Sequence, residues 1–231
     1  MSSLRRTSVV SGGTGGLGRA VTAALLGAGD RVVVPWIAED ERRDLEQAHP
    51  EAASQDRLVF VQADVTGTEG AGAVARVAGP ATLLVNGVGG FAGGMPVVET
   101  ELEVWDRLYR MNVRSAVALS RALLPDMIAR RRGIVVNVAS EAAVARPAGL
   151  AAYSASKDAV LVLTETLQKE VLAFGIRVNA ISPSTIDTEA NRRAMPDADF
   201  STWTAPADIA AVVLTLASDA ARSVRGARIP V

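Results

Sequence analysis

The chain has 231 residues, of which 49% are hydrophobic and 21% charged, and its formal net charge at pH 7 is −1. This length suits one α/β domain with a single large core, and the near-neutral charge argues against nucleic acid or an anionic membrane as a partner. The absence of cysteine excludes disulfides, thiol nucleophiles and thiolate metal sites. No apolar run reaches the roughly 18 residues that span a bilayer, and the amino terminus lacks a signal-peptide layout. We therefore expect a cytoplasmic protein without a metal site.

The first expected strand, Thr7 to Ser11, leads directly into the glycine-rich run Gly12 to Gly18. A helical pattern follows from Ala20 to Ala28, and Gly29 ends it. Glycines let a backbone approach a pyrophosphate closely, and a helix amino terminus offers unpaired N–H groups to that anion. A strand, a glycine turn and a helix in this order predict a dinucleotide-binding site.

The second expected strand, Arg31 to Pro35, is followed by Trp36 where the reader of the adenosine ribose should lie. A carboxylate at that point selects NAD, whereas an arginine nearby accepts the 2′-phosphate of NADP. Trp36 supplies neither, although charged residues follow closely at Glu39, Asp40, Arg42 and Arg43. The sequence therefore predicts NADP or NAD as cofactor, with a weak preference for NADP.

A short helix from Asp40 to Ala48, ended by Pro50, precedes a third strand from Leu58 to Val61. Asp64, just beyond it, stands where an edge carboxylate could meet the adenine amino group. A fourth strand, Thr82 to Asn86, leads into a second glycine-rich run that extends to Gly94. This run either brings the backbone close to a ligand or turns the chain, and both interpretations stay open.

Two helical stretches are expected between Glu101 and Ala129, with Asn112 inside the first. Asparagine has a low intrinsic helix preference, so Asn112 fits either a buried polar role or a kink. The fifth strand runs from Ile134 to Val138, and Ser140 follows its carboxyl end.

A long helix from Tyr153 to Phe174 begins with Tyr153-Ser154-Ala155-Ser156-Lys157. Positions i and i+4 share one helix face, so Tyr153 and Lys157 lie one turn apart. A cation held beside a phenol favours the phenolate and lowers its pKa, and a tuned proton donor and acceptor is what catalysis at neutral pH requires. The pair by itself also fits a half-buried aromatic residue beside a solvated lysine, so its context has to decide.

The sixth strand, Ile176 to Ile181, precedes an irregular stretch from Thr185 to Pro206. Long connections in compact domains tend to be functional, so we expect residues 184–206 to form a substrate lid. A final helix, Asp208 to Ser218, and a terminal strand, Ala227 to Val231, complete the chain. The apolar residues of the lid are Met195, Phe200 and Trp203.

Alternating strands and helices predict a Rossmann-type, doubly wound parallel sheet of about seven strands with helices on both faces, forming one domain over residues 1–231. Ligands of such sheets bind beyond the carboxyl ends of the strands. Five stretches follow strand ends and should meet at that edge: Gly12 to Gly18, Asp64, Asn86 to Gly94, Ser140, and Pro183 to Thr188. This convergence favours a functional role for Tyr153 and Lys157.

On these motifs the chain resembles the short-chain dehydrogenase/reductase family over essentially its whole length. The glycine loop Ser11-Gly12-x-x-x-Gly16-x-Gly18 is similar to the family's Thr-Gly-x-x-x-Gly-x-Gly, and Asn86-Gly87-Val88-Gly89 corresponds to its Asn-Asn-Ala-Gly with two departures. Pro183-Ser184-x-x-x-Thr188 is similar to Pro-Gly-x-x-x-Thr, whose threonine contacts the nicotinamide amide. The residues that match the catalytic tetrad are Asn112, Ser140, Tyr153 and Lys157.

The resemblance implies NAD(P)H-dependent hydride transfer between nicotinamide and a carbonyl or secondary alcohol. Tyr153 would donate the proton, Ser140 would hold the same oxygen, Lys157 would bind the nicotinamide ribose, and Asn112 would position a water. The residues expected to contact the cofactor are Gly12, Thr14, Gly15, Gly16, Leu17, Gly18, Trp36, Asp64, Val65, Asn86, Gly87, Val88, Tyr153, Lys157, Pro183, Ile186 and Thr188.

A narrower resemblance connects residues 186–200 and the run Gly89 to Gly94 with dihydropteridine reductase, a divergent member that lacks the serine kept here as Ser140. It implies an alternative function, the reduction of a C=N bond in a pterin-like ring. A second alternative is a non-catalytic dinucleotide-binding regulator, although this chain retains all four tetrad positions. The residues expected at the substrate are Gly90, Phe91, Met195, Phe200 and Trp203.

The expected partners are a small-molecule substrate and further copies of the chain. The helical regions Glu101 to Ala129 and Tyr153 to Phe174 carry more apolar residues than one sheet face could cover. Members of the family that the chain resembles pair through these helices, so a homodimer or homotetramer is expected.

Overall fold

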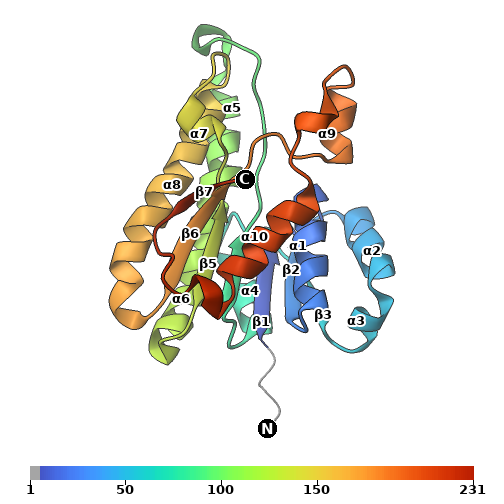
Figure 1. The fold of residues 1–231 in the computed structure, drawn as a ribbon, viewed down its shortest axis with the longest axis vertical. Coiled ribbons are helices and arrows are strands. Elements are labelled where there is room, and N and C mark those ends of the chain that lie inside the picture. The colour runs from blue at the N-terminus through green and yellow to red at the C-terminus, as the bar shows by residue number, and fades with distance from the viewer. Residues whose placement is uncertain (1–5) are drawn as a thin grey trace.

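The computed structural model describes residues 6–231 and contains a seven-stranded parallel sheet between two layers of helices (Figure 1). The strand order is β3-β2-β1-β4-β5-β6-β7. The strands are β1 (Thr7–Ser11), β2 (Arg31–Trp36), β3 (Leu58–Gln62), β4 (Leu83–Asn86), β5 (Ile134–Val138), β6 (Arg177–Ser182) and β7 (Arg228–Pro230). The predicted fold class, a Rossmann-type doubly wound sheet, is confirmed.

Helices cover both faces of the sheet, which explains why its strands are apolar rather than alternating with polar residues. Consecutive valines of β1 point to opposite faces: Val10 packs with residues of α1 (Gly16–Gly27) and α10 (Pro206–Leu216). Val9 packs with residues of the opposite layer. That layer consists of α4 (Thr68–Ala78), α6 (Ser115–Arg130) and α8 (Ala151–Val171).

The helix boundaries differ from the predicted ones where glycine and proline begin helices instead of ending them. Helix α1 starts at Gly16, four residues before the predicted start, because the last glycines of the loop already have helical geometry. Pro50 does not simply end α2 (Glu39–Ala48); it is the first residue of α3 (Pro50–Ser54). Proline suits that position because its missing N–H is not needed there.

Asn112 lies in a π-helical turn, Arg110–Arg114, between α5 (Leu102–Tyr109) and α6. The wider turn interrupts the regular helix, and the Asn112 side chain is buried. Both roles considered for this residue, a kink and a buried polar group, are therefore present together. Single π turns inside helices are frequent at functional sites.

Residues 185–206 are more ordered than the sequence predicts, because they contain α9 (Glu189–Ala194) and the 3-10 turn Phe200–Thr202. The Thr188 hydroxyl caps α9 by accepting a hydrogen bond from the N–H of Asn191 at 3.2 Å. A parallel bridge between Ile186 and Thr204 joins the two ends of the segment. A short helix α7 (Ala142–Ala145) was also not predicted.

No helix within residues 6–231 is both long enough and apolar enough to cross a membrane.

Candidate active site

The two glycine-rich loops pack directly against each other at the carboxyl ends of β1 and β4. Gly12 has a φ of +70°, and a Cβ there would lie 2.7 Å from the carbonyl oxygen of Gly87. A Cβ on Gly18 would lie 1.9 Å from the carbonyl oxygen of Gly12, so a side chain fits at neither position. The Ser11 hydroxyl accepts a hydrogen bond from the N–H of Gly87 at 3.1 Å and joins the loops.

A cleft of about 490 Å³ opens beside these loops. The amino terminus of α1 starts at the same glycine loop, and no side chain of residues 6–231 caps it, so its first N–H groups remain available to an anion. The predicted cofactor residues that line the cleft are Gly12, Thr14, Gly15, Trp36, Asp64, Val65, Gly87 and Val88. Glycine backbone, a helix amino terminus and apolar walls together fit a dinucleotide.

Other predicted cofactor residues lie next to this cleft rather than in its lining. Gly16, Leu17 and Gly18 form the first turn of α1. Thr188 packs on that turn, since a Cβ on Gly16 would lie 2.7 Å from the Thr188 Cγ2. Pro183 and Ile186 follow the end of β6. Asn86 is buried at the end of β4 and donates a hydrogen bond to the Asn137 side chain at 2.8 Å.

The structure adds cleft residues that the sequence did not single out. They are Pro35, Ile37, Ala38, Glu41, Ala63, Thr66, Arg110 and Met111. Most of them are neighbours of predicted residues in the chain, but Glu41 comes from the first turn of α2. It follows Gly18 at about the spacing that places an acidic residue at the ribose of dinucleotide folds, which is a signal the sequence offered.

Asp64 lies at the cleft, but its carboxylate is already engaged. Its Oδ1 accepts hydrogen bonds from the N–H and the hydroxyl of Thr66 at 2.9 and 2.7 Å. These bonds, with weaker help from the guanidinium groups of Arg110 and Arg114, hold the Asp64 pKa below its usual value. The Asp64 carboxylate therefore places a negative charge at the rim of the cleft, and its hydrogen bonds go to Thr66 in the same turn.

The four tetrad residues come from three different elements that meet at the carboxyl edge of the sheet. Tyr153 and Lys157 lie one turn apart in the first half of α8, and Ser140 follows β5. A hydrogen bond with the Ser140 hydroxyl lowers the pKa of Tyr153, but burial raises it by more. The predicted lowering of the Tyr153 pKa by Lys157 is therefore wrong for this structure, in which the Tyr153 pKa is raised.

Lys157 is buried, and its contacts explain why it does not act on the phenol directly. Its Nζ donates a hydrogen bond to the carbonyl oxygen of Val138 at 2.9 Å and lies 6.0 Å from the centroid of the Tyr153 ring. Burial lowers the pKa of Lys157 to about 8. The Lys157 ammonium group is thus held at the end of β5, in buried surroundings that disfavour its charge.

Asn112 is tied to the second glycine loop and to α8 at the same time. Its Oδ1 accepts a hydrogen bond from the N–H of Gly90 at 2.8 Å, and its Nδ2 donates to the carbonyl oxygen of Gly90 at 3.1 Å. The same Nδ2 donates to the Ser156 hydroxyl at 2.8 Å, and Ser156 donates to the carbonyl oxygen of Tyr153 at 2.7 Å. Ser156, which the sequence analysis did not single out, therefore connects Asn112 to the catalytic helix.

Gly89 joins the cleft to the tetrad. It lines the cleft, and a Cβ on it would lie 2.8 Å from the Asn112 Oδ1 and 3.2 Å from the Lys157 Nζ. Any larger residue would push into both side chains. The cofactor cleft and the tetrad are thus adjacent parts of one site.

The predicted substrate residues separate into two groups. Phe91 packs edge-on against Tyr153, with ring centroids 4.9 Å apart, and its own side chain is largely exposed. Gly90 is held by Asn112. Within the lid, Phe200 contacts Trp203 at a centroid distance of 4.7 Å and lies under the Arg192 guanidinium. Phe91 is therefore the one predicted substrate residue that contacts Tyr153.

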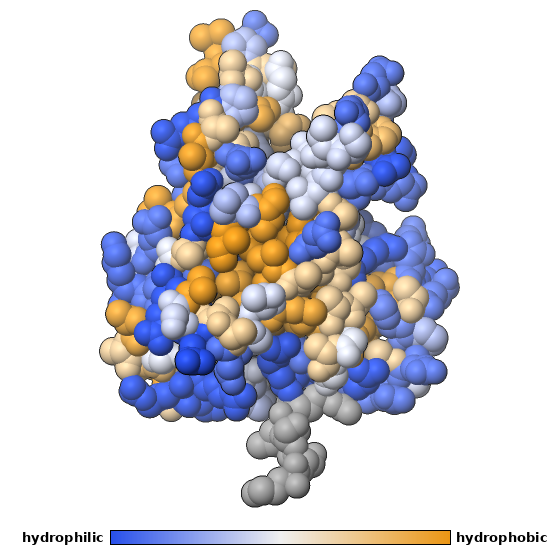
Figure 2. Space-filling view, viewed as in Figure 1, coloured by the Kyte–Doolittle hydropathy of each residue, from blue (hydrophilic) through white to orange (hydrophobic). Residues whose placement is uncertain are grey.

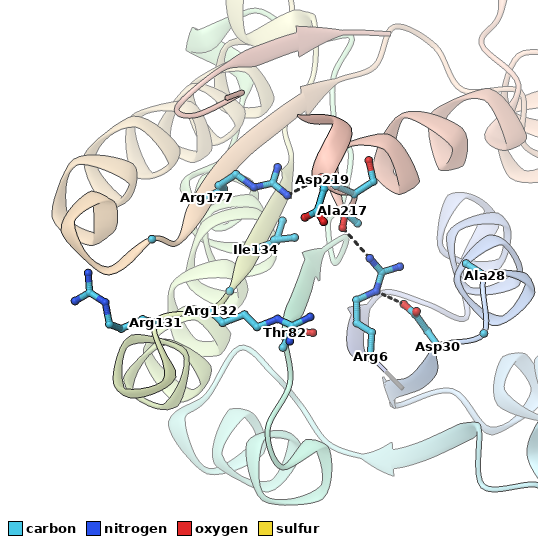
Figure 3. Close-up of a pocket in the computed structure, with 14 residues that line it drawn as sticks. Arg6, Ala28, Asp30, Thr82, Arg131, Arg132, Ile134, Arg177, Ala217 and Asp219 are labelled. Carbon is cyan, nitrogen blue, oxygen red and sulfur yellow. Dashed lines mark hydrogen bonds and ion pairs between the residues drawn. The ribbon is translucent and has the colours of Figure 1, made fainter. Parts of the chain in front are cut away.

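A larger cavity, about 920 Å³, lies at the opposite edge of the sheet, where the strands begin (Figure 3). Three of its four arginines, Arg6, Arg131 and Arg177, donate hydrogen bonds to the protein itself. Arg177 donates to the carbonyl oxygens of Leu216, Ser218 and Ala221 at 2.7–3.0 Å. Arg6 pairs with Asp30 at 2.7 Å. None of the tetrad residues lines this cavity.

Comparison with known proteins agrees with this geometry. Residues 6–199 match the family model for short chain dehydrogenases. The chain is 36% identical to the galactitol 2-dehydrogenase of Rhizobium johnstonii, covering 95% of this chain and 91% of that protein. It is 30% identical to the NAD-dependent glycerol dehydrogenase of Listeria innocua, covering 96% and 90%.

Solved structures show the same fold over the whole chain. A short-chain type dehydrogenase/reductase from Mycobacterium ulcerans superposes with a TM-score of 0.92 at 25% identity, covering all of this chain and 90% of that one. Levodione reductase superposes with a TM-score of 0.90 at 25% identity, covering 98% and 95%. The chain belongs to the short chain dehydrogenase family, and it is an NAD(P)-dependent oxidoreductase that acts on CH–OH and C=O groups.

Proposed function

We propose that Tyr153 transfers the proton in a reversible conversion between a secondary alcohol and a ketone. The observation that carries this proposal is the cluster at the carboxyl edge, where Tyr153 and Lys157 lie one turn apart on α8 and Ser140 follows the end of β5. Nicotinamide, when bound in the cleft, supplies or accepts the hydride. The protein's own residues supply position and proton transfer.

Each tetrad residue has a distinct task in this proposal. The raised pKa keeps Tyr153 protonated at neutral pH, so it can give its proton to the substrate oxygen during reduction. Ser140 donates a hydrogen bond to the same oxygen and stabilises the charge that develops there. Lys157 holds the nicotinamide ribose, and Asn112 fixes the loop at Gly90 beside it.

The cofactor-binding residues are proposed to be those of the cleft and of the adjoining turns. The first turn of α1 would hold the pyrophosphate, with Thr188 lying over it. The weak preference for NADP that the sequence predicts rests on residue 36 alone. The glycerol dehydrogenase relative, in contrast, is named for NAD.

Small polyols and their ketones are the proposed substrate class. The two relatives above are named for galactitol and glycerol, which are both polyols. Phe91, packed on Tyr153 and exposed on its other side, would form one wall of the substrate site. Residues 184–206, including Met195, Phe200 and Trp203, would form the lid of a single-domain enzyme.

Reduction of a C=N bond in a pterin-like ring is the second candidate, and only the likeness of the lid sequence favours it. A substrate panel separates the two functions. Cofactor oxidation is followed with a series of polyol-derived ketones and with a quinonoid dihydropterin. Turnover of ketones supports the proposal, and exclusive turnover of the dihydropterin would replace it.

We further propose a cytoplasmic homodimer or homotetramer. The helical regions predicted to pair leave large apolar side chains exposed, among them Leu102, Tyr109 and Val162. Apolar surface also gathers in the middle of the face that carries α10 and β7 (Figure 2). Light scattering on the purified protein tests the assembly, since a monomer at micromolar concentration would contradict it.

The proposed role of Tyr153 is tested by Tyr153→Phe, which removes the hydroxyl and keeps the ring packed on Phe91. Turnover should fall by roughly 10²–10⁴-fold, the range for losing a general acid, while the dissociation constant of the cofactor stays nearly unchanged. The chain's other tyrosine, Tyr109, is exposed on α5 and provides the matched control. Tyr109→Phe should keep full turnover, and a Tyr153→Phe variant with comparable activity would overturn the assignment.

A further inference from the structure

A carboxylate from α2 reaches the cofactor cleft and bonds to the glycine loop. The Thr14 hydroxyl donates a hydrogen bond to the Glu41 Oε2 at 2.7 Å, and both residues line the cleft. Thr14 is buried, whereas Glu41 is exposed to solvent at the rim. Trp36 lines the same cleft, so Glu41 supplies it with a carboxylate that the end of β2 does not.

The cations around Trp36 are already paired with other carboxylates. Arg42 stacks on the Trp36 ring at 5.5 Å, and its N–H groups donate to Glu39 at 3.0 Å and to Glu46 at 2.7 Å. Arg43 donates to the same Glu39 at 2.9 Å. These guanidinium groups are therefore held along α2 by its own acidic residues instead of facing the cleft as anion receptors.

The whole helix is acidic. Between Glu39 and Ala48 it carries five carboxylates against two guanidinium groups, a net charge of −3. The one guanidinium among the residues that line the cleft, Arg110, lies 3.7 Å from the Asp64 carboxylate. A 2′-phosphate adds close to two negative charges to the adenosine ribose, so this rim repels it, whereas a 2′-hydroxyl can donate a hydrogen bond to a carboxylate.

We propose that Glu41 is the residue that selects NAD over NADP in this enzyme. It replaces, from the helix after β2, the strand-end carboxylate that is absent at Trp36. The bond from Thr14 holds its carboxylate at the cleft and leaves its other oxygen for the ribose hydroxyl. The proposal rests on NAD(P) binding in this cleft, and it reverses the weak preference for NADP that position 36 alone suggests.

The test measures binding rather than turnover, so it does not depend on the proposed catalytic role of Tyr153. Isothermal titration calorimetry gives the dissociation constants of NAD⁺ and NADP⁺, and of the fragments 5′-AMP and adenosine 2′,5′-bisphosphate. The full-length wild-type chain is compared with Glu41→Gln, which keeps the size of the side chain and removes its charge. Asp40→Asn is the matched control, because Asp40 is an exposed carboxylate on the same helix turn that does not line the cleft.

Wild type should bind NAD⁺ at least ~10-fold more tightly than NADP⁺, as a charge pair in a partly excluded cleft implies. Glu41→Gln should reduce this ratio by at least about fivefold, and the fragments should show the same change, whereas Asp40→Asn should leave it within about twofold. Equal or tighter binding of NADP⁺ by wild type would overturn the proposal. An unchanged ratio in Glu41→Gln, or an equal change in Asp40→Asn, would also overturn it.

If neither dinucleotide nor fragment binds wild type, the cleft is not the cofactor site, and the proposed function fails together with this inference. If both bind but the ratio does not respond to Glu41, the selectivity role alone fails.

Discussion

The two edges of the sheet differ in a way that cavity size does not reveal. The amino edge holds the larger cavity, about 920 Å³, and the carboxyl edge holds the cleft of about 490 Å³. At the amino edge, Arg177 donates hydrogen bonds to three backbone carbonyl groups from the end of α10 and the turn after it. At the carboxyl edge, Lys157 is buried and Tyr153 is half-buried, each with few partners, and their pKa values are shifted.

This difference separates side chains that stabilise the fold from those that are available for chemistry. A buried charged group that already donates to several carbonyl groups has little left to offer a ligand. A buried titratable group beside an open cleft has a perturbed pKa and a route to substrate, which is typical of active sites. The amino edge should therefore affect stability, and the carboxyl edge should affect turnover.

Ser140→Ala gives the largest effect in this set, since it removes a hydrogen-bond donor from the reacting oxygen. Turnover should fall on the order of 100-fold, the scale for one oxyanion donor. The same hydroxyl lowers the pKa of Tyr153, so its loss should also shift the basic limb of the pH–rate profile to higher pH. Steady-state kinetics across the pH range checks both effects, and a fully active variant would favour the pterin-type reaction.

Arg177→Met tests the amino edge, because it removes the guanidinium group that donates to three backbone carbonyl groups there. Losing three hydrogen bonds to buried carbonyl groups should lower the free energy of unfolding by about 3 kcal/mol, as measured by urea denaturation. Arg132→Gln, which changes an exposed residue lining the same cavity, is the control and should leave the melting temperature nearly unchanged. Turnover per folded Arg177→Met molecule should match wild type; a selective loss of turnover would break the distinction between the edges.

The buried ammonium of Lys157 should make stability depend on pH at the carboxyl edge. Its pKa falls from the usual 10.5 to about 8 in the fold. Between these values the unfolded chain binds more protons than the native one, so stability rises with pH across this window and its penalty is complete below about pH 8. The raised pKa of Tyr153 acts oppositely, but only above its usual value of 10.

Lys157→Met isolates this contribution, and Lys169→Met, at the only other lysine of the chain, is the control. Unfolding by urea at about pH 8 and pH 10 should show a smaller gain of stability with pH in Lys157→Met than in wild type. Lys169 is exposed on the same helix, so its variant should follow wild type. Equal gains in all three proteins would show that Lys157 is not held in a setting that disfavours its charge.

Periodicity was enough to predict the strands, because buried parallel strands are apolar and bounded by turn residues. The strands Thr7–Ser11 and Ile134–Val138 were predicted at their observed bounds, and the others within about two residues. The helix α4 was missed because its alanines and glycines give a weak apolar pattern. The order inside residues 185–206 depends on the cap at Thr188 and the bridge to Thr204, which are contacts across the loop.

The candidate site was predictable where it follows strand ends and unpredictable where it depends on side-chain packing. Motif spacing placed the tetrad correctly at one edge, but the direction of the Tyr153 pKa depends on burial, which spacing does not give. The part that Ser156 plays in the site is shown only by its hydrogen bonds with Asn112 and with the carbonyl oxygen of Tyr153. The place of Glu41 in the cleft depends on how α2 packs against the glycine loop, which the sequence does not give. Only its spacing from Gly18 indicated that an acidic residue could lie there.

The most direct measurement compares turnover per cofactor-binding site in Tyr153→Phe and Arg177→Met, with the sites counted by calorimetric titration. Counting sites removes the effect of unfolded protein, so each variant reports only on chemistry. Tyr153→Phe should keep a full set of sites and lose at least ~100-fold in turnover, whereas Arg177→Met should keep the wild-type turnover at each site that it retains. Wild-type turnover in Tyr153→Phe would contradict the account that the carboxyl edge carries the proton transfer.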